Sequence, residues 1–177
     1  MLAVVSSIRK FKTLWPLPGG AGHYVQTLRY ILQLASESDD LDQLLEVLSE
    51  RYKLVSYKAA RSYTNVAKTL GFIDIEGRLV HLTPAGHGAL AGQLQDLLGP
   101  ALMERVSACH EVIEILRVRP HRIGRLRKLL AEEGFDWGTD AQLRYRLRWL
   151  EEAGIVSRIG QAAPMYGVNS GNESVLG

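Results

Sequence analysis

The feature that most constrains this chain is a weak internal repeat. Leu70-Gly71-Phe72-Ile73 in the first half matches Ala153-Gly154-Ile155-Val156 in the second, an offset of 83 residues between positions 70 and 153. In both copies an amphipathic stretch precedes the glycine and a β-prone stretch follows it. The same offset aligns three further pairs of positions: Arg61 with Arg144, Ser62 with Tyr145, and Asn65 with Arg148. The repeat predicts two small domains of similar architecture.

The first copy predicts three helices followed by a hairpin. Asp40 and Ser56 are good caps for the second and third helices, because their side-chain oxygens accept hydrogen bonds from the first turn. Gly71 ends the third helix, since glycine readily adopts the left-handed backbone of a helix C-terminus. Glu76-Gly77-Arg78 is a plausible tight turn between two strands. The predicted helices are 23–35, 41–50 and 57–70, and the predicted strands are 72–75 and 79–82.

The second copy predicts the same order after a linker helix. Thr83-Pro84 suits a helix start, and we expect the linker to run from Pro84 to about Leu98 and to end at Gly99-Pro100. Thr139 or Asp140 caps the third helix of this copy, which Gly154 ends. The remaining predicted helices are 106–119 and 122–133, and the strands are 155–159 and 165–168. The predicted divisions are an N-terminal arm (1–22), a first domain with its linker helix (23–98), a second domain (99–168) and a flexible tail (169–177).

Composition excludes several classes of protein. No apolar run approaches the ~20 residues that cross a membrane, and the N-terminus lacks the basic region of a signal peptide. The single cysteine, Cys109, cannot form an internal disulfide, which fits a reducing cytoplasm. One cysteine and five scattered histidines do not make a structural zinc site. We therefore expect a cytoplasmic protein with no cofactor, no metal, no membrane contact and no evident small-molecule substrate.

Charge is segregated along the chain although the net charge is only +2. Five basic residues and no acid lie between Arg51 and Phe72, and six basic residues and no acid lie between Arg117 and Lys128. Such segregation is typical of a phosphate-binding surface. Ordinary solvated helix faces are the alternative, and charge alone does not separate the two.

Three helices followed by a two-stranded hairpin resemble the winged helix, a variant of the helix-turn-helix. The resemblance rests on Leu70-Gly71-Phe72-Ile73, on the hairpin, and on the exit Leu82-Thr83-Pro84-Ala85-Gly86, which is similar to that of many bacterial winged-helix regulators. It covers roughly residues 23–168 and implies a mainly α fold with small β wings (α+β), as tandem winged helices joined by a linker helix. It further implies binding of double-stranded DNA by a transcription regulator, a replication initiator or a specificity module of a restriction or defence system.

The third helix of the first copy carries the most informative polar pattern. Helix-turn-helix proteins place this helix in the major groove, where arginine suits guanine and asparagine suits adenine. No acid interrupts the stripe, whereas an ordinary exposed helix face usually includes one. The predicted DNA-binding residues on this helix are Lys58, Arg61, Ser62, Asn65 and Lys68, with Arg78 at the wing.

The third helix of the second copy has a mixed outward face. Its predicted DNA-binding residues are Gln142, Arg144, Tyr145 and Arg148, and Arg146 flanks them. Trp149 falls on the same face and either contacts a partner or packs against the first copy. Four residues of the preceding helix are predicted to contact the DNA backbone: Arg122, Arg125, Arg127 and Lys128. Arg158 lies near the second wing.

The N-terminal arm has two possible uses. Arg9, Lys10 and Lys12 are basic and suit an arm that reaches DNA. We favour core packing of Phe11 and Trp15 as the main use of this segment.

No pattern indicates catalysis. Asp74 and Glu76 lie in a predicted wing with no lysine beside them, unlike the carboxylate cluster of a metal-dependent nuclease. Cys109 and His110 are adjacent on a predicted helix, so their side chains diverge and make a poor nucleophile–base pair. The glycines at 19, 20 and 22 have no following lysine and no preceding strand, so they do not form a phosphate loop.

A protein-interaction scaffold is the alternative from another functional class. It resembles accessory subunits of chromosome segregation, in which tandem winged helices bind a protein partner or form a homodimer. In that case Tyr145, Trp149 and Glu151-Glu152 would face the partner. The helix 57–70 discriminates between the two hypotheses: an uncovered stripe favours DNA, and a covered stripe favours a protein partner.

Overall fold

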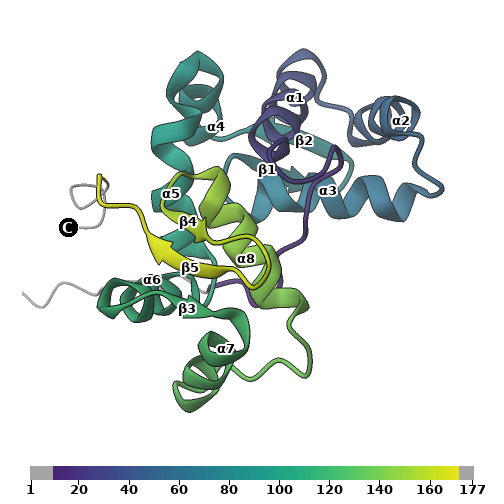
Figure 1. Ribbon diagram of the computed structural model, residues 1–177. Helices are drawn as coiled ribbons and strands as arrows, with labels where there is room; N and C mark the ends of the chain where they lie inside the picture. The colour runs from purple at the N-terminus through teal and green to yellow at the C-terminus, as the bar shows by residue number, and fades with distance from the viewer. Residues whose placement is uncertain (1–9, 172–177) are drawn as a thin grey trace, which may run out of the picture.

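The computed structural model describes residues 10–171, which form a mainly helical α+β structure with two small antiparallel sheets (Figure 1). The first half begins with three helices and a hairpin. The helices are α1 (Tyr24–Glu37), α2 (Leu41–Tyr52) and α3 (Tyr57–Thr69), and the strands are β1 (Ile73–Glu76) and β2 (Leu79–Leu82).

Local chemistry explains the ends of these helices. The Asp40 carboxylate accepts hydrogen bonds from the amides of Asp42 and Gln43 at the start of α2, and the Ser56 hydroxyl accepts one from Ala59 at the start of α3. Gly71 follows α3 at φ +80°, where a residue with a side chain would be strained. The predicted caps and the predicted stop of α3 are confirmed.

The exit from the first hairpin is tied to the end of α3. The Thr83 hydroxyl donates to the carbonyl of Gly71 at 2.6 Å and accepts from the amide of Gly86 at 3.1 Å. A Cβ atom at Gly86 would lie 2.0 Å from the Phe72 carbonyl oxygen. The short motif noticed in the sequence therefore fixes the hairpin, α3 and the next helix to one another.

The linker differs from the prediction. It comprises α4 (Pro84–Gly88), a wide π-type turn (Ala89–Gln93) and α5 (Leu94–Arg105). The break lies at Gly92, whose φ is +106°, and α5 continues through Gly99-Pro100, where the sequence predicted an end. Pro100 thus lies inside a helix, although proline has no amide hydrogen to donate there.

The second half repeats the element order of the first. It contains α6 (Cys109–Val118), β3 (His121–Arg122), α7 (Ile123–Glu132), α8 (Ala141–Glu152), β4 (Val156–Ile159) and β5 (Met165–Val168). The order in the second sheet is β3-β5-β4. In the second half, β3 lies just before α7 and pairs with β5. In the first half, the equivalent contact is an isolated β-bridge between Asp40, just before α2, and Leu79 of β2. The repeat seen in the sequence therefore corresponds to a repeated arrangement.

Two predicted helix starts in the second half are wrong by a few residues. The helix expected from Val106 starts at Cys109, because Ala108 has a left-handed backbone with φ +67°. The helix expected from Arg122 starts at Ile123, because Arg122 belongs to a strand. The division expected between residues 98 and 99 falls inside α5.

One continuous core joins the two halves. The rings of Tyr24 of α1 and Trp149 of α8 pack against each other at a tilt of 47°, with their centroids 5.0 Å apart. The N-terminal segment (residues 10–22) inserts the buried Leu14 and Leu17 into the same core and passes beside α8 before it enters α1 (Figure 1). None of the helices within residues 10–171 has the length and apolar character needed to span a lipid bilayer.

Candidate nucleic-acid interface

The predicted stripe on α3 is uncovered along its first three turns. Lys58, Arg61 and Asn65 are exposed on the side of α3 opposite its buried residues Ala60, Val66 and Ala67. Ser62 is half-buried, and its hydroxyl donates to the carbonyl of Lys58 at 3.0 Å. Within the described residues Lys58 and Arg61 have no ion-pair partner. Two cations and an amide thus face solvent at helical spacing.

The last predicted residue of the stripe and the wing arginine have structural partners. Lys68 is half-buried, and its ammonium donates to the carbonyl of Ile75 at 3.2 Å, which joins α3 to β1. Arg78 forms an exposed ion pair with Asp42 of α2. The N-terminal segment also borders the end of the stripe, because Lys12 and Trp15 line a small cavity together with Asn65 and Lys68. The free part of the stripe is therefore its N-terminal part.

On α7 the structure separates one predicted residue from the other three. Arg122, Arg125 and Lys128 are exposed and have no ion-pair partner among the described residues. Arg127 is half-buried and pairs with Asp140 at 3.0 Å. Asp140 also forms an ion pair with Arg144 of α8 at 3.5 Å, so both arginines contact the α7–α8 connection.

The outward face predicted for α8 is largely an internal contact. The Gln142 side-chain oxygen accepts from the Leu14 amide at 3.1 Å, and the ring of Tyr145 lies 6.3 Å from that of Trp15. Arg148 is half-buried, 3.8 Å from Glu151. Trp149 is fully buried, and its indole nitrogen donates to the Trp15 carbonyl at 2.9 Å. Packing against the first half, one of the two alternatives for Trp149, is confirmed.

Arg146 is buried, although the sequence placed it beside an exposed face. Its guanidinium donates to the carbonyls of Lys12 at 2.7 Å and Ser107 at 2.8 Å, and to the Gln142 side chain at 2.9 Å. It also lies over the Trp137 ring, 4.7 Å from the centroid. Burial lowers the pKa of Arg146 below its ordinary value, and none of its hydrogen-bond partners is a carboxylate. The side chain fixes the N-terminal segment to α8 and to the start of α6.

The N-terminal segment packs differently from the prediction. Phe11 and Trp15 are 38% and 47% exposed, and Leu14 and Leu17 fill the core in their place. Phe11 instead pairs through its backbone with Arg105 and Ser107. The backbone carbonyls of Lys12 and Trp15 accept hydrogen bonds from Arg146 and Trp149. No side-chain pattern in the sequence indicates that a backbone carbonyl will have this role. Arg9, part of the proposed basic arm, lies outside the described residues.

The C-terminal tail is held at its beginning. The Asn169 side chain donates to the Gly154 carbonyl at 2.6 Å, and the Asn169 backbone amide donates to the Ile155 carbonyl. The rest of the predicted flexible tail, residues 172–177, lies outside the described part of the chain.

The residues considered for catalysis are placed as follows. Asp74 and Glu76 are exposed on β1. Cys109 is fully buried, and burial raises the pKa of its thiol to about 12. Residues 10–171 contain no group of three or more histidine, cysteine, aspartate or glutamate side chains arranged to hold a metal ion.

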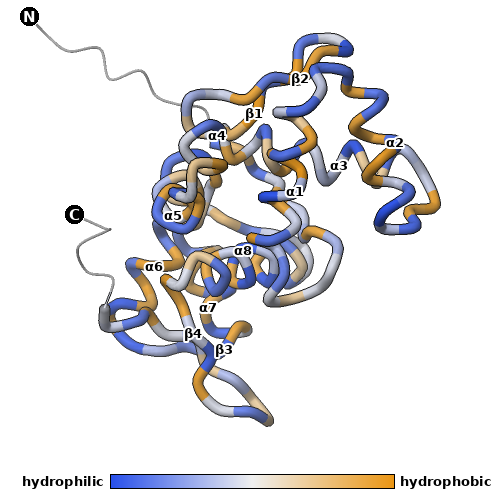
Figure 2. Tube along the Cα trace, turned by 90° about the horizontal axis from the view of Figure 1, so that it is seen from above, coloured by the Kyte–Doolittle hydropathy of each residue, from blue (hydrophilic) through white to orange (hydrophobic). Residues whose placement is uncertain are grey.

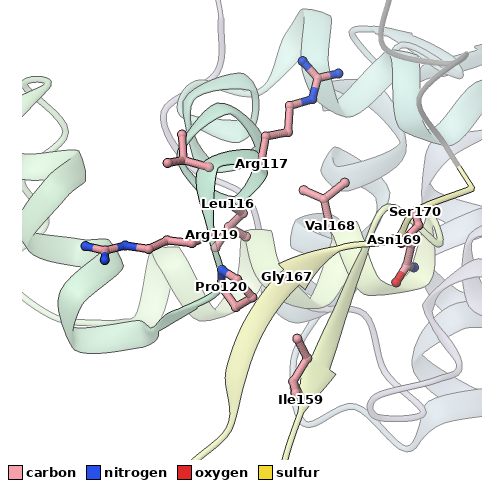
Figure 3. Close-up of a pocket in the computed structure, with 10 residues that line it drawn as sticks. Leu116, Arg117, Arg119, Pro120, Ile159, Gly167, Val168, Asn169 and Ser170 are labelled. Atoms are coloured by element: carbon pink, nitrogen blue, oxygen red, sulfur yellow. The ribbon is translucent and has the colours of Figure 1, made fainter.

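A cavity of about 650 Å³, which the sequence did not reveal, lies between the end of α6 and the second hairpin (Figure 3). Ile159 and Pro120 close over Gly167, where a Cβ would come within 3.1 Å of the Ile159 side chain. Val118 at the rim is 82% exposed. Arg117 and Arg119 point to different sides of this cavity (Figure 3). The cavity is formed by segments far apart in sequence, so no local pattern marks it.

Comparison with protein-family models, with curated proteins and with solved structures found no match to this chain.

Proposed function

We propose that this protein binds double-stranded DNA and reads base edges in the major groove with α3. The observation that carries the proposal is the uncovered stripe of Lys58, Arg61 and Asn65, which is free of acidic side chains. Arginine and asparagine each make two hydrogen bonds to the edge of one base, guanine and adenine respectively. Lys58, one turn earlier on the helix, suits a phosphate.

The architecture around α3 supports the proposal. Three helices precede a hairpin, and a short bridge from the start of α2 reaches that hairpin, an arrangement that resembles a winged helix. Gly71, Thr83 and Gly86 hold the hairpin against α3, so the exposed side chains project from a rigid element. Sites on rigid elements give the fixed geometry that base recognition requires.

The two halves have different roles under this proposal. We expected α8 to read DNA as α3 does, but its face is occupied by the N-terminal segment through Gln142, Tyr145 and Trp149. The same contacts occupy the surface that the protein-scaffold hypothesis required. Base reading is thus assigned to α3 alone. Transcription regulation, replication initiation and recognition for a defence system are all compatible with one reading helix.

The proposal is tested by selecting a preferred duplex from a random library and then titrating it by fluorescence anisotropy. Arg61→Ala and Asn65→Ala should each weaken binding to the selected site by about 1–3 kcal/mol, the usual cost of a lost bidentate base contact. Arg29→Ala is the matched control, because Arg29 is exposed on α1 and has no ion-pair partner among residues 10–171. Absence of binding by the wild type at low salt, or equal losses in all three variants, contradicts the proposal.

A further inference from the structure

A second group of free cations lies at the junction of α6, β3 and α7. Arg119 precedes the two-residue strand β3, Arg122 is its second residue, and Arg125 and Lys128 follow one turn apart on the exposed side of α7. Within residues 10–171 none of the four side chains has an ion-pair or hydrogen-bond partner. The first turn of α7 has no acidic residue and no side-chain cap. The first acid on the exposed side of α7 is Glu132, at the far end of the helix.

Two of these cations act on the same buried residue. Burial, followed by the charges of Arg119 and Arg125, lowers the pKa of His121. Like charges placed together cost stability, and soluble proteins normally intersperse the two signs on a surface. The neighbouring Arg117 and Arg127 form ion pairs with Glu114 and Asp140. The four cations without such a partner therefore form a distinct surface.

This surface is separate from the α3 stripe. Figure 1 and Figure 2 both place α8 between α3 and α7, so the two groups of cations lie on different parts of the molecule. Gly124 lies within the surface, and a Cβ there would meet nothing within 4 Å. The surface thus includes the start of α7, and a helix N-terminus is favourable to an anion.

We infer that Arg119, Arg122, Arg125 and Lys128 form a second nucleic-acid contact, which binds backbone phosphates without reading sequence. The surface contains no aromatic anchor of the kind that dominates protein interfaces, although the exposed Val118 and Met165 border it beside Arg119 and Arg122. Long, flexible cations without ion-pair partners in the described part of the chain suit a row of phosphates. The inference rests on the proposed DNA binding and assigns the second half to affinity rather than to specificity.

The test compares salt dependence in three full-length proteins: wild type, Arg125→Gln/Lys128→Gln and Arg29→Gln/Arg51→Gln. Both variants lose two exposed positive charges, but Arg29 and Arg51 lie on the α1–α2 side, away from α7. Each protein is titrated with the selected duplex and with a scrambled duplex across a salt series. Circular dichroism and thermal unfolding verify that all three are folded.

We expect the α7 variant to lower the slope of log K against log salt by roughly two, since each phosphate contact contributes about 0.9. Its preference for the selected over the scrambled duplex should stay unchanged, and the control should keep the wild-type slope. An unchanged slope in the α7 variant overturns the inference and leaves the reading by α3 intact. Equal losses in both variants indicate a general charge effect and also overturn it.

Two further outcomes are distinguishable from these. A wild type that binds no DNA overturns the proposed function and this inference together. If the α7 variant retains the wild-type slope and instead loses binding to an acidic protein in a parallel titration, the surface serves a protein partner.

Discussion

The guanidinium of Arg146 donates a hydrogen bond of 2.7 Å to the carbonyl oxygen of Lys12, across 134 positions of sequence. Arg146 belongs to α8, the helix that the repeat aligns with α3, the proposed DNA-reading helix of the first half. In that position it does not face DNA but joins the N-terminal segment to the second half. A buried cation with several acceptors and no carboxylate is a costly arrangement, so its removal has predictable consequences.

Replacement of Arg146 by alanine should lower the free energy of unfolding by about 3–5 kcal/mol, because several buried acceptors lose their donor at once. Arg146→Lys should also destabilise the protein, since an ammonium cannot reproduce the planar fork of donors. Urea denaturation followed by circular dichroism measures both. The control Arg144→Ala, on the exposed side of α8, should change stability by less than about 1 kcal/mol. A similar loss in the two alanine variants would contradict the burial of Arg146.

Gly86→Ala should lower the free energy of unfolding by about 3 kcal/mol, the upper end of the usual cost of overpacking. The new methyl group would lie 2.0 Å from the Phe72 carbonyl oxygen, a rigid backbone atom. Gly124→Ala makes the same chemical change in an exposed helix with open space around it. That control should gain about 0.5–1 kcal/mol from helix propensity. Thermal unfolding of both variants gives the comparison, and a tolerated Gly86→Ala would refute the close packing of the hairpin exit.

Cys109 should resist alkylation while the protein is folded. Burial raises the pKa of its thiol to about 12, so the reactive thiolate is scarce at pH 8 and inaccessible to reagents. Mass spectrometry after treatment with iodoacetamide should show an unmodified native protein and one modified cysteine after denaturation. Rapid modification of the native protein would show that the start of α6 opens readily.

His121 should make the protein less stable in mild acid. Burial, followed by Arg119 and Arg125, lowers the pKa of its imidazole below the usual 6.5. The unfolded chain therefore binds a proton before the folded protein does, and stability falls as the pH drops below about 6.5. Urea denaturation from pH 7.5 to pH 5 should show a steeper decline for wild type than for His121→Gln, which cannot titrate. Parallel curves for the two proteins would exclude this role for His121.

The sequence by itself determined the local elements and their repeated order. Asp40 and Ser56 cap helices through hydrogen bonds to neighbouring amides, and Gly71 ends a helix through its own backbone freedom. Such effects act over a few residues, so they can be predicted without tertiary information. Pro100 is the exception, because α5 continues through it and the actual break occurs at Gly92.

Only the tertiary structure decided which faces of similar helices stay exposed. The repeat aligns Arg61 with Arg144 and Asn65 with Arg148, yet α3 faces solvent while the N-terminal segment and α1 cover much of α8. Arg146 and Trp149 are held by the carbonyls of Lys12 and Trp15, residues more than a hundred positions away. A backbone carbonyl is the same for every residue type, so no pattern of side chains reveals that it will serve as a partner. The packing of distant segments therefore decides which helix faces are exposed, and with them the candidate interface.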